Sequence, residues 1–162
     1  MFRTTFRAAS LALTFALPAL AAAGAENPGQ LRAALAAADG RDWPRAMAAA
    51  RAAGPLSAAI IDWERLRDGQ GSFAEYSAFL SRYPDWPGLP YLRKRGEAVL
   101  DGVPGGDVIA FFEGHVPQTG TGSLALIAAL EEAGRTTAAK DEAVRAWRTL
   151  SMTADEHARF IA

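Results

Sequence analysis

The sequence has 162 residues and contains no cysteine and only two histidines. The lack of cysteine excludes disulfides, a thiolate nucleophile and the lipidated cysteine of a lipoprotein. His115 and His157 lie far apart in the chain and show neither an HExxH motif nor another paired-ligand spacing. We therefore expect both histidines at surface or loop positions, and we predict neither a metal site nor a cofactor.

Long hydrophobic runs, β-branched runs and an excess of charge of one sign are also lacking. The longest apolar stretch, residues 8–20, which is apolar apart from Ser10 and Thr14, is shorter than the about 20 residues that a membrane-spanning helix needs. Strands are hard to place without β-branched runs. The 17 basic and 18 acidic residues give a net charge of −1, which argues against nucleic acid and anionic lipid as partners.

The N-terminal residues have the three-part layout of a secretory signal peptide. Arg3 and Arg7 precede the apolar run, small residues follow it, and no acidic residue occurs before Glu26. We predict that residues 1–25 are a signal peptide cleaved near Ala23 or Ala25, and that residues 26–162 form the exported part, with no membrane attachment after cleavage. The alternatives are an amphipathic N-terminal helix or a retained anchor.

The exported part is rich in helix-forming residues, and its helix boundaries are well marked. Asn27 and Asp42 are predicted N-caps, and the pairs Ser72–Glu75 and Thr153–Glu156 are predicted capping boxes. These signals predict roughly eight or nine helices of ordinary length. They cover residues 28–39, 43–53, 56–67, 89–100, 107–113 and 122–133, a helix that begins at Phe73, one that begins at Thr136, and a last one after Thr153.

This pattern predicts an all-α fold in which short antiparallel helices form an α-solenoid, or superhelix. A weak internal echo supports the solenoid. Gly40-Arg41 stands eleven positions before Arg51-Ala52, and Gly134-Arg135 stands eleven positions before Arg145-Ala146. We expect residues 40–52 and residues 134–146 each to form the second half of a helical hairpin.

Helical periodicity predicts which faces are buried. Leu56, Ile60 and Trp63 share one face of a helix, and Ala139, Ala143, Trp147 and Leu150 share one face of another, so we expect both tryptophans in the core. Trp86 lies in the proline-rich loop of residues 83–90, and we expect it to pin that loop onto the helices. The alternative is that aromatic rings stack on sugars; the candidates are Trp43, Trp63, Trp86, Trp147, Tyr83 and Tyr91.

No residue pattern identifies a catalytic centre. Asp62 and Glu64 diverge on a helix because residues two apart do not face each other, and Glu131-Glu132 is most simply a solvated pair. No G-x-S-x-G occurs, and the glycine-rich residues 120–123 are predicted to be a helix-opening turn. We interpret Arg93-Lys94-Arg95 as a solvated helix face. We therefore assign no catalytic, cofactor-binding or metal-binding residue.

Two segments resemble soluble lytic murein transglycosylases. Residues 83–97 combine a proline break with LRKRGE, which resembles the L-R-x-R-x-E helix of that family. Residues 108–120 contain FFEGHVPQT, which resembles its F-F-x-x-x-x-P-x-T element, and residues 133–135 and 143–148 resemble the helices that follow. The resemblance spans residues 28–162 and implies a periplasmic protein.

The resemblance also implies an activity. In the family, an N-terminal superhelix supports a lysozyme-like domain that cleaves the MurNAc–GlcNAc bond of peptidoglycan without hydrolysis and leaves a 1,6-anhydro sugar. The family's catalytic glutamate is followed by serine. None of the glutamates in this sequence is followed by serine, so the resemblance covers only the scaffold and carries over no catalytic residue.

Three functions follow as hypotheses. The first is the N-terminal scaffold of such an enzyme, which would contact peptidoglycan glycan strands through the intact protein; the apolar stop at residues 160–162 favours a truncated chain. The second is a stand-alone periplasmic helical-repeat adaptor that binds a protein partner. The third is an independent enzyme that uses Glu113 or Asp62.

Overall fold

The computed structural model describes residues 26–161, and the predicted signal peptide, residues 1–25, and Ala162 lie outside them. The described residues form only helices, turns and loops, so the prediction of an all-α fold is confirmed. The helices are α1 (Pro28–Asp39), α2 (Trp43–Ala53), α3 (Pro55–Arg67), α4 (Phe73–Arg82), α5 (Leu89–Gly96), the 3₁₀ turn η1 (Glu97–Val99), α6 (Gly105–Phe111), α7 (Gly120–Glu132), α8 (Thr136–Thr149) and α9 (Ala154–Phe160).

The predicted helix starts are confirmed where a local cap marks them. The Asn27 side chain accepts hydrogen bonds from the backbone N–H groups of Gly29 and Gln30, and the Asp42 side chain accepts one from Arg45. Both predicted capping boxes are present, one at the start of α4 and one at the start of α9. Each cap satisfies N–H groups that have no partner inside their helix.

Three predicted boundaries are wrong by a few residues. The helix predicted to reach Leu100 changes to a 3₁₀ turn at Glu97, and α6 covers residues 105–111 instead of 107–113. Helix α7 begins at Gly120 because the Thr119 hydroxyl caps it and accepts a hydrogen bond from Gly122 N at 3.0 Å.

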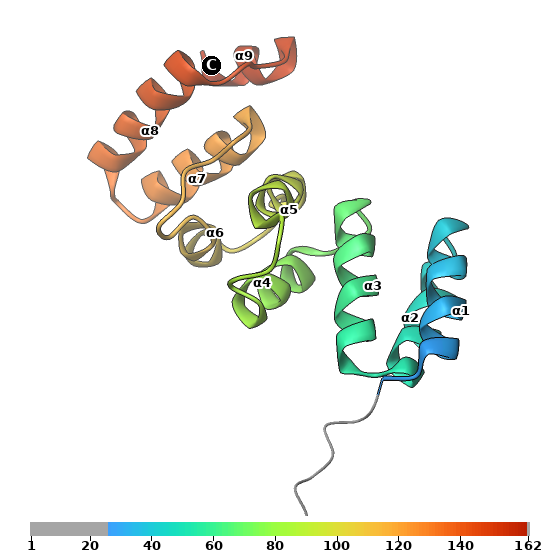
Figure 1. Cartoon of the computed structure of the whole chain (residues 1–162). Helices are drawn as coiled ribbons and strands as arrows, with labels where there is room; N and C mark the ends of the chain where they lie inside the picture. The colour runs from blue at the N-terminus through green and yellow to red at the C-terminus, as the bar shows by residue number, and fades with distance from the viewer. Residues whose placement is uncertain (1–25, 162) are drawn as a thin grey trace, which may run out of the picture.

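Helices pack mainly against neighbours in the sequence. Helices α1, α2 and α3 pack together, α4 packs on α5, and α6, α7 and α8 form a second group with α9 against α7. Helix α5 contacts α3, and the 3₁₀ turn η1 that follows α5 contacts α7, so the middle of the chain links the group α1–α3 to the group α6–α9. As a result α1 and α9 lie at opposite ends of the molecule (Figure 1). No helix among residues 26–161 has the length and apolar character needed to cross a membrane.

Two clusters of buried side chains hold the helices together. The small one lies under α1, α2 and α3 and consists of Ala34, Ala46, Ala50 and Ile61. The large one extends from α3 to α7 and contains Leu66, Tyr76, Phe79, Leu80, Leu89, Leu92, Leu100, Val108, Phe111, Phe112 and Ala129. Alanines in the small cluster let α1 and α2 approach closely, whereas leucines and aromatic rings fill the wider space of the large one.

Trp86 pins the proline-rich loop, as predicted. Its ring centroid lies 5.1 Å from that of Tyr83, 5.6 Å from that of Phe79 and 6.5 Å from that of Trp63. These are contact distances for tilted and edge-to-face aromatic pairs, which add to the free energy of burying the rings. The loop between α4 and α5 therefore lies on the large cluster.

The predicted core role of Trp147 is wrong. Its side chain is 51% exposed, and its ring lies against that of exposed His157 in a tilted arrangement, with 4.7 Å between the centroids. Helix α8 instead turns Ala139, Glu142 and Ala146 inward. The prediction for α3 is correct for Trp63, which packs against the large cluster, but wrong for Leu56, which is 54% exposed, and Ile61 is buried instead. The spacing of apolar residues shows which of them share a helix face, but the position of the neighbouring helices determines which of these residues are buried.

Replacing each of these tryptophans tests the assignment. We expect Trp86→Ala to lower the free energy of unfolding by about 3 kcal/mol, the lower end for truncating a packed aromatic side chain. Trp147→Ala should cost under about 1 kcal/mol because half of its side chain is already exposed. Urea unfolding followed by circular dichroism measures both, and equal losses would contradict the packing described here.

Candidate functional site

The two segments that carry the family resemblance meet in the structure. Glu97, from the first segment, is buried, with 1% of its surface exposed. One carboxylate oxygen accepts a hydrogen bond from Gln118 N at 2.8 Å. The other accepts hydrogen bonds from Thr119 N at 2.8 Å and from the Thr119 hydroxyl at 2.5 Å. The last residue of LRKRGE therefore binds the last residue of FFEGHVPQT.

A second contact joins the same segments through glycines. Gly96 packs against the Phe111 ring, and a Cβ atom at Gly96 would lie only 2.9 Å from Phe111 Cζ. Gly122, in the first turn of α7, lies so close to the Glu97 carboxylate that a side chain there would displace it. These two glycines let a ring and a carboxylate approach the backbone closely.

The environment of Glu97 has opposing effects on its pKa. Burial disfavours the charged carboxylate and raises the pKa, while the hydrogen bonds from Thr119 and Gln118 lower it; burial is the larger effect, and the pKa lies above its ordinary value. The donors, Gln118 and the N-cap residue Thr119, lie just before α7, where the positive end of the helix dipole favours a negative charge. Glu97 thus has the contacts of a structural carboxylate.

A second carboxylate, Glu156 of α9, also binds the start of α7. It accepts hydrogen bonds from Thr121 N at 2.7 Å and from the Thr121 hydroxyl at 2.9 Å. Its other oxygen accepts one from Thr153 N at 2.8 Å and closes the capping box of its own helix. These hydrogen bonds, led by that from Thr153, lower the pKa of Glu156.

A buried polar network fixes α8 beside this point. The Ser123 hydroxyl donates to Glu142 at 2.6 Å, and Arg145 forms an ion pair with the same carboxylate at 2.6 Å. Arg145 also donates to the Pro117 carbonyl at 3.0 Å. The glycine-rich residues 120–123 therefore form the helix-opening turn that the sequence predicts, and their polar groups bind carboxylates of this chain.

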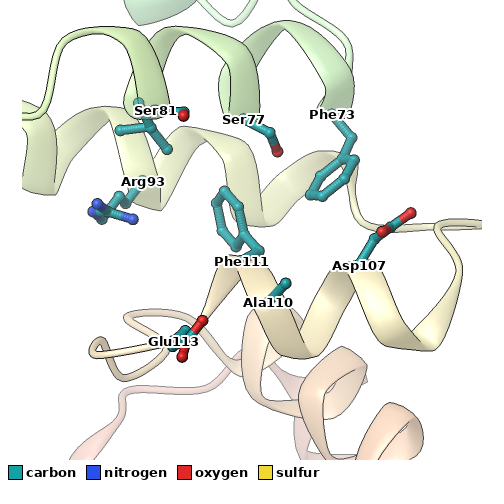
Figure 2. A pocket seen from close by; sticks show the side chains of 9 residues that line it. Phe73, Ser77, Ser81, Arg93, Asp107, Ala110, Phe111 and Glu113 are labelled. Atoms are coloured by element: carbon teal, nitrogen blue, oxygen red, sulfur yellow. The ribbon is translucent and has the colours of Figure 1, made fainter.

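A groove of about 400 Å³ lies between α4, α5 and α6. It is lined by Phe73, Ser77, Leu80, Ser81, Arg93, Asp107, Ala110, Phe111 and Glu113. Arg93 and Ser81 lie at one end with Glu113 below them, and Phe73 and Asp107 lie at the other end (Figure 2). Ser77 extends from α4 toward Phe111 in the middle (Figure 2).

The polar side chains that line this groove have no ion-pair or side-chain hydrogen-bond partner among residues 26–161, and two of them bear on its chemistry. The Ser77 hydroxyl is buried and forms no hydrogen bond. Arg93 takes part in none of the ion pairs or side-chain hydrogen bonds found in the described part of the chain. Burial lowers the pKa of its guanidinium. A buried polar group is normally paired, so the Ser77 hydroxyl, together with the half-buried Arg93 guanidinium in the same groove, marks a candidate ligand site.

The solvated face proposed for residues 93–95 is therefore only partly correct. Lys94 is exposed, but Arg93 and Arg95 are half-buried. The sequence analysis also did not single out Ser77. Its position between apolar Phe73 and Leu80 is compatible with a buried helix face, but nothing in the sequence shows that its hydroxyl lacks a partner.

The other candidate residues do not converge on this groove, except for Glu113. Asp62 pairs with Arg65 at 2.8 Å, and Glu64 lies 3.6 Å from Arg67. Glu131 and Glu132 are exposed at the end of α7, and His115 is exposed in the loop after α6. Residues 26–161 contain no group of three or more histidine, aspartate or glutamate side chains placed to hold a metal ion.

The aromatic candidates for sugar stacking are mostly occupied by packing. Trp63, Tyr83 and Trp86 pack against the large cluster, and Trp43 packs against the small one. Tyr91 is 48% exposed, with the Arg67 guanidinium 5.8 Å from its ring centroid. Tyr91 and Trp147 are therefore the candidates with about half of their surface open to solvent.

Comparison with protein-family models, with curated proteins and with solved structures found no match to this chain.

Replacing Glu97 tests the contact between the two segments. Glu97→Gln keeps the shape of the side chain but turns an amide NH₂ toward donors, so one or more N–H groups lose their acceptor. We expect a loss of about 1–3 kcal/mol in the free energy of unfolding at neutral pH. Glu113→Gln, an exposed position with the same chemical change, is the control and should be near neutral. If Glu97→Gln left the free energy of unfolding unchanged, the role given to this carboxylate would be contradicted.

The pH dependence of stability tests Glu156. Its folded-state pKa is lowered from 4.5, so its contribution is present above the unfolded-state pKa and disappears as the pH falls through the lower folded-state value. Glu156→Gln should therefore be less stable than the parent chain at pH 7, and the difference should shrink as the pH falls below about 4.5. Thermal unfolding at several pH values measures this, and a difference that grows on acidification would contradict it.

Proposed function

We propose that residues 26–162 are the N-terminal scaffold of a periplasmic lytic transglycosylase that cleaves the MurNAc–GlcNAc bond of peptidoglycan. The observation that carries the proposal is the contact of Glu97 with Thr119. The two stretches that resemble the family are separate in the sequence, and the last residue of one motif binds the last residue of the other.

The proposal includes an α-solenoid arrangement of the helices. Its support is the neighbour-to-neighbour packing and the two hairpins, α1–α2 and α7–α8, whose second helices carry the internal echo of the sequence. In solenoids each unit contacts mainly the adjacent ones and offers an extended surface to a large partner. A glycan strand, reached through the intact protein, is the partner that the resemblance implies.

Export to the periplasm is part of the same proposal. Removal of residues 1–25 near Ala23 or Ala25 leaves Glu26 in the mature chain. Glu26 accepts hydrogen bonds from Leu56 N at 2.7 Å and Ser57 N at 3.2 Å, at the start of α3. The mature chain would thus begin at or just before a residue whose carboxylate binds the start of α3.

A second candidate function is a periplasmic adaptor that binds a protein partner. The observation that favours it is an exposed apolar pair on α8. Val144 and Trp147 are each 51% exposed and lie three residues apart, hence on one helix face. Exposed apolar side chains that share a face are typical of protein interfaces.

The scaffold proposal is tested with the mature chain and with the genome. We expect the purified chain to sediment with peptidoglycan sacculi and to release no 1,6-anhydromuropeptides, because it has no glutamate followed by serine. We also expect the DNA that follows the codon of Ala162 to encode, in some frame, a lysozyme-like domain with that motif.

Three outcomes would contradict the scaffold proposal. Release of anhydromuropeptides would give the chain an activity of its own. Absence of a lysozyme-like sequence downstream would remove the enzyme that it supports. A folded, monodisperse chain that captures one defined protein, loses it in Trp147→Ala and ignores sacculi would support the adaptor.

A further inference from the structure

The groove between α4, α5 and α6 combines an apolar floor with charges at its rim. Phe73, Leu80 and Phe111 supply the apolar surface, and Arg93, Asp107 and Glu113 supply the charges. A volume of about 400 Å³ is within the range of sites for small ligands. An amphipathic ligand of a few residues would match it in size and character.

Arg93 defines which charge such a ligand carries. Its guanidinium has no ion-pair partner among the described residues, and part of its surface is removed from water. A guanidinium in this state favours a carboxylate, which it can bind through two parallel hydrogen bonds. The Ser77 hydroxyl, also without a partner, can donate to or accept from a peptide group in the middle of the groove.

The two carboxylates of the groove restrict the ligand further. Glu113 lies on the Arg93 side of the groove and Asp107 at the opposite end (Figure 2). A ligand with negative charge alone would be repelled by both, whereas one with carboxylate and ammonium groups meets Arg93 and an acidic side chain together. A neutral glycan has no group that needs Arg93.

We propose that this groove binds a short zwitterionic peptide, whose free carboxylate contacts Arg93 and whose ammonium group faces Glu113 on the same side of the groove. The identity of the peptide rests on the proposed function: it is the peptide that branches from the glycan strands of peptidoglycan. Where such a peptide contains diaminopimelate, it has an ammonium and a carboxylate on one carbon, next to an apolar chain. The scaffold would then recognise the peptide part of the wall.

The test is calorimetric titration of the mature chain with a purified disaccharide tripeptide that ends in diaminopimelate. Three further probes are the same disaccharide tripeptide with its carboxyl groups amidated, the disaccharide without a peptide, and a zwitterionic tripeptide that does not occur in the cell wall. We expect binding of the first probe and at least about tenfold weaker binding of its amidated form, the loss that accompanies a missing charge-assisted hydrogen bond.

Three variants locate the site. Arg93→Ala should weaken binding at least about tenfold, and Ser77→Ala about threefold or more. Ser77→Ala should leave thermal stability unchanged or raised, because its hydroxyl makes no hydrogen bond within the described structure. Lys94→Ala removes a positive charge from the same helix outside the groove and should bind like the parent chain.

Normal binding by Arg93→Ala and Ser77→Ala would overturn the inference, and retained sedimentation with sacculi would then leave the scaffold proposal in place. Equal binding of the peptide-free disaccharide would also overturn it in favour of glycan recognition. Binding of the foreign tripeptide through Arg93, with no binding to sacculi or muropeptide, would support a peptide groove and contradict the scaffold proposal.

Discussion

Carboxylates bound at the starts of helices fix how the elements of this molecule meet. Glu97 and Glu156 reach the start of α7 from two different helices, and Glu26 reaches the start of α3. The first turn of a helix has N–H groups without intrahelical acceptors and a partial positive charge. A carboxylate from another element satisfies both, so each of these contacts fixes where two elements meet. Burial of the apolar clusters stabilises the folded chain, whereas these hydrogen bonds fix which residues of two elements lie side by side.

The groove depends on the contact at Glu97. The chain between α6 and α7 is held at its end by Glu97 and by Arg145, which binds the Pro117 carbonyl. At the start of the same segment the Phe111 ring rests on Gly96. Helix α6 is therefore fixed against α5 at one side, and the space left beside α4 is the groove. The residues of the resemblance position the groove, although most of its lining lies outside the two motifs.

Local features of the fold could be predicted because local residues cause them. Asn27, Asp42 and the two capping boxes act over three residues, and the prolines after Tyr83 end a helix whatever surrounds them. The faces of α3 and α8 could not be predicted, because burial of Trp147 or Leu56 depends on where a neighbouring helix passes. Arg93 was assigned to solvent for the same reason. A groove assembled from three helices has no signature in any one of them.

Packing between neighbours has a consequence for how the chain acquires its structure. Contacts that join elements close in sequence need only short loops to close, and folding is fast when such contacts dominate. The hairpins α1–α2 and α7–α8 lie at opposite ends of the molecule, and each has its own packed interface (Figure 1). Each hairpin therefore depends mainly on contacts that are local in the sequence. The contacts of Glu97, whose donors lie about twenty residues further along the chain, instead close a longer loop, which costs more chain entropy than closing a hairpin.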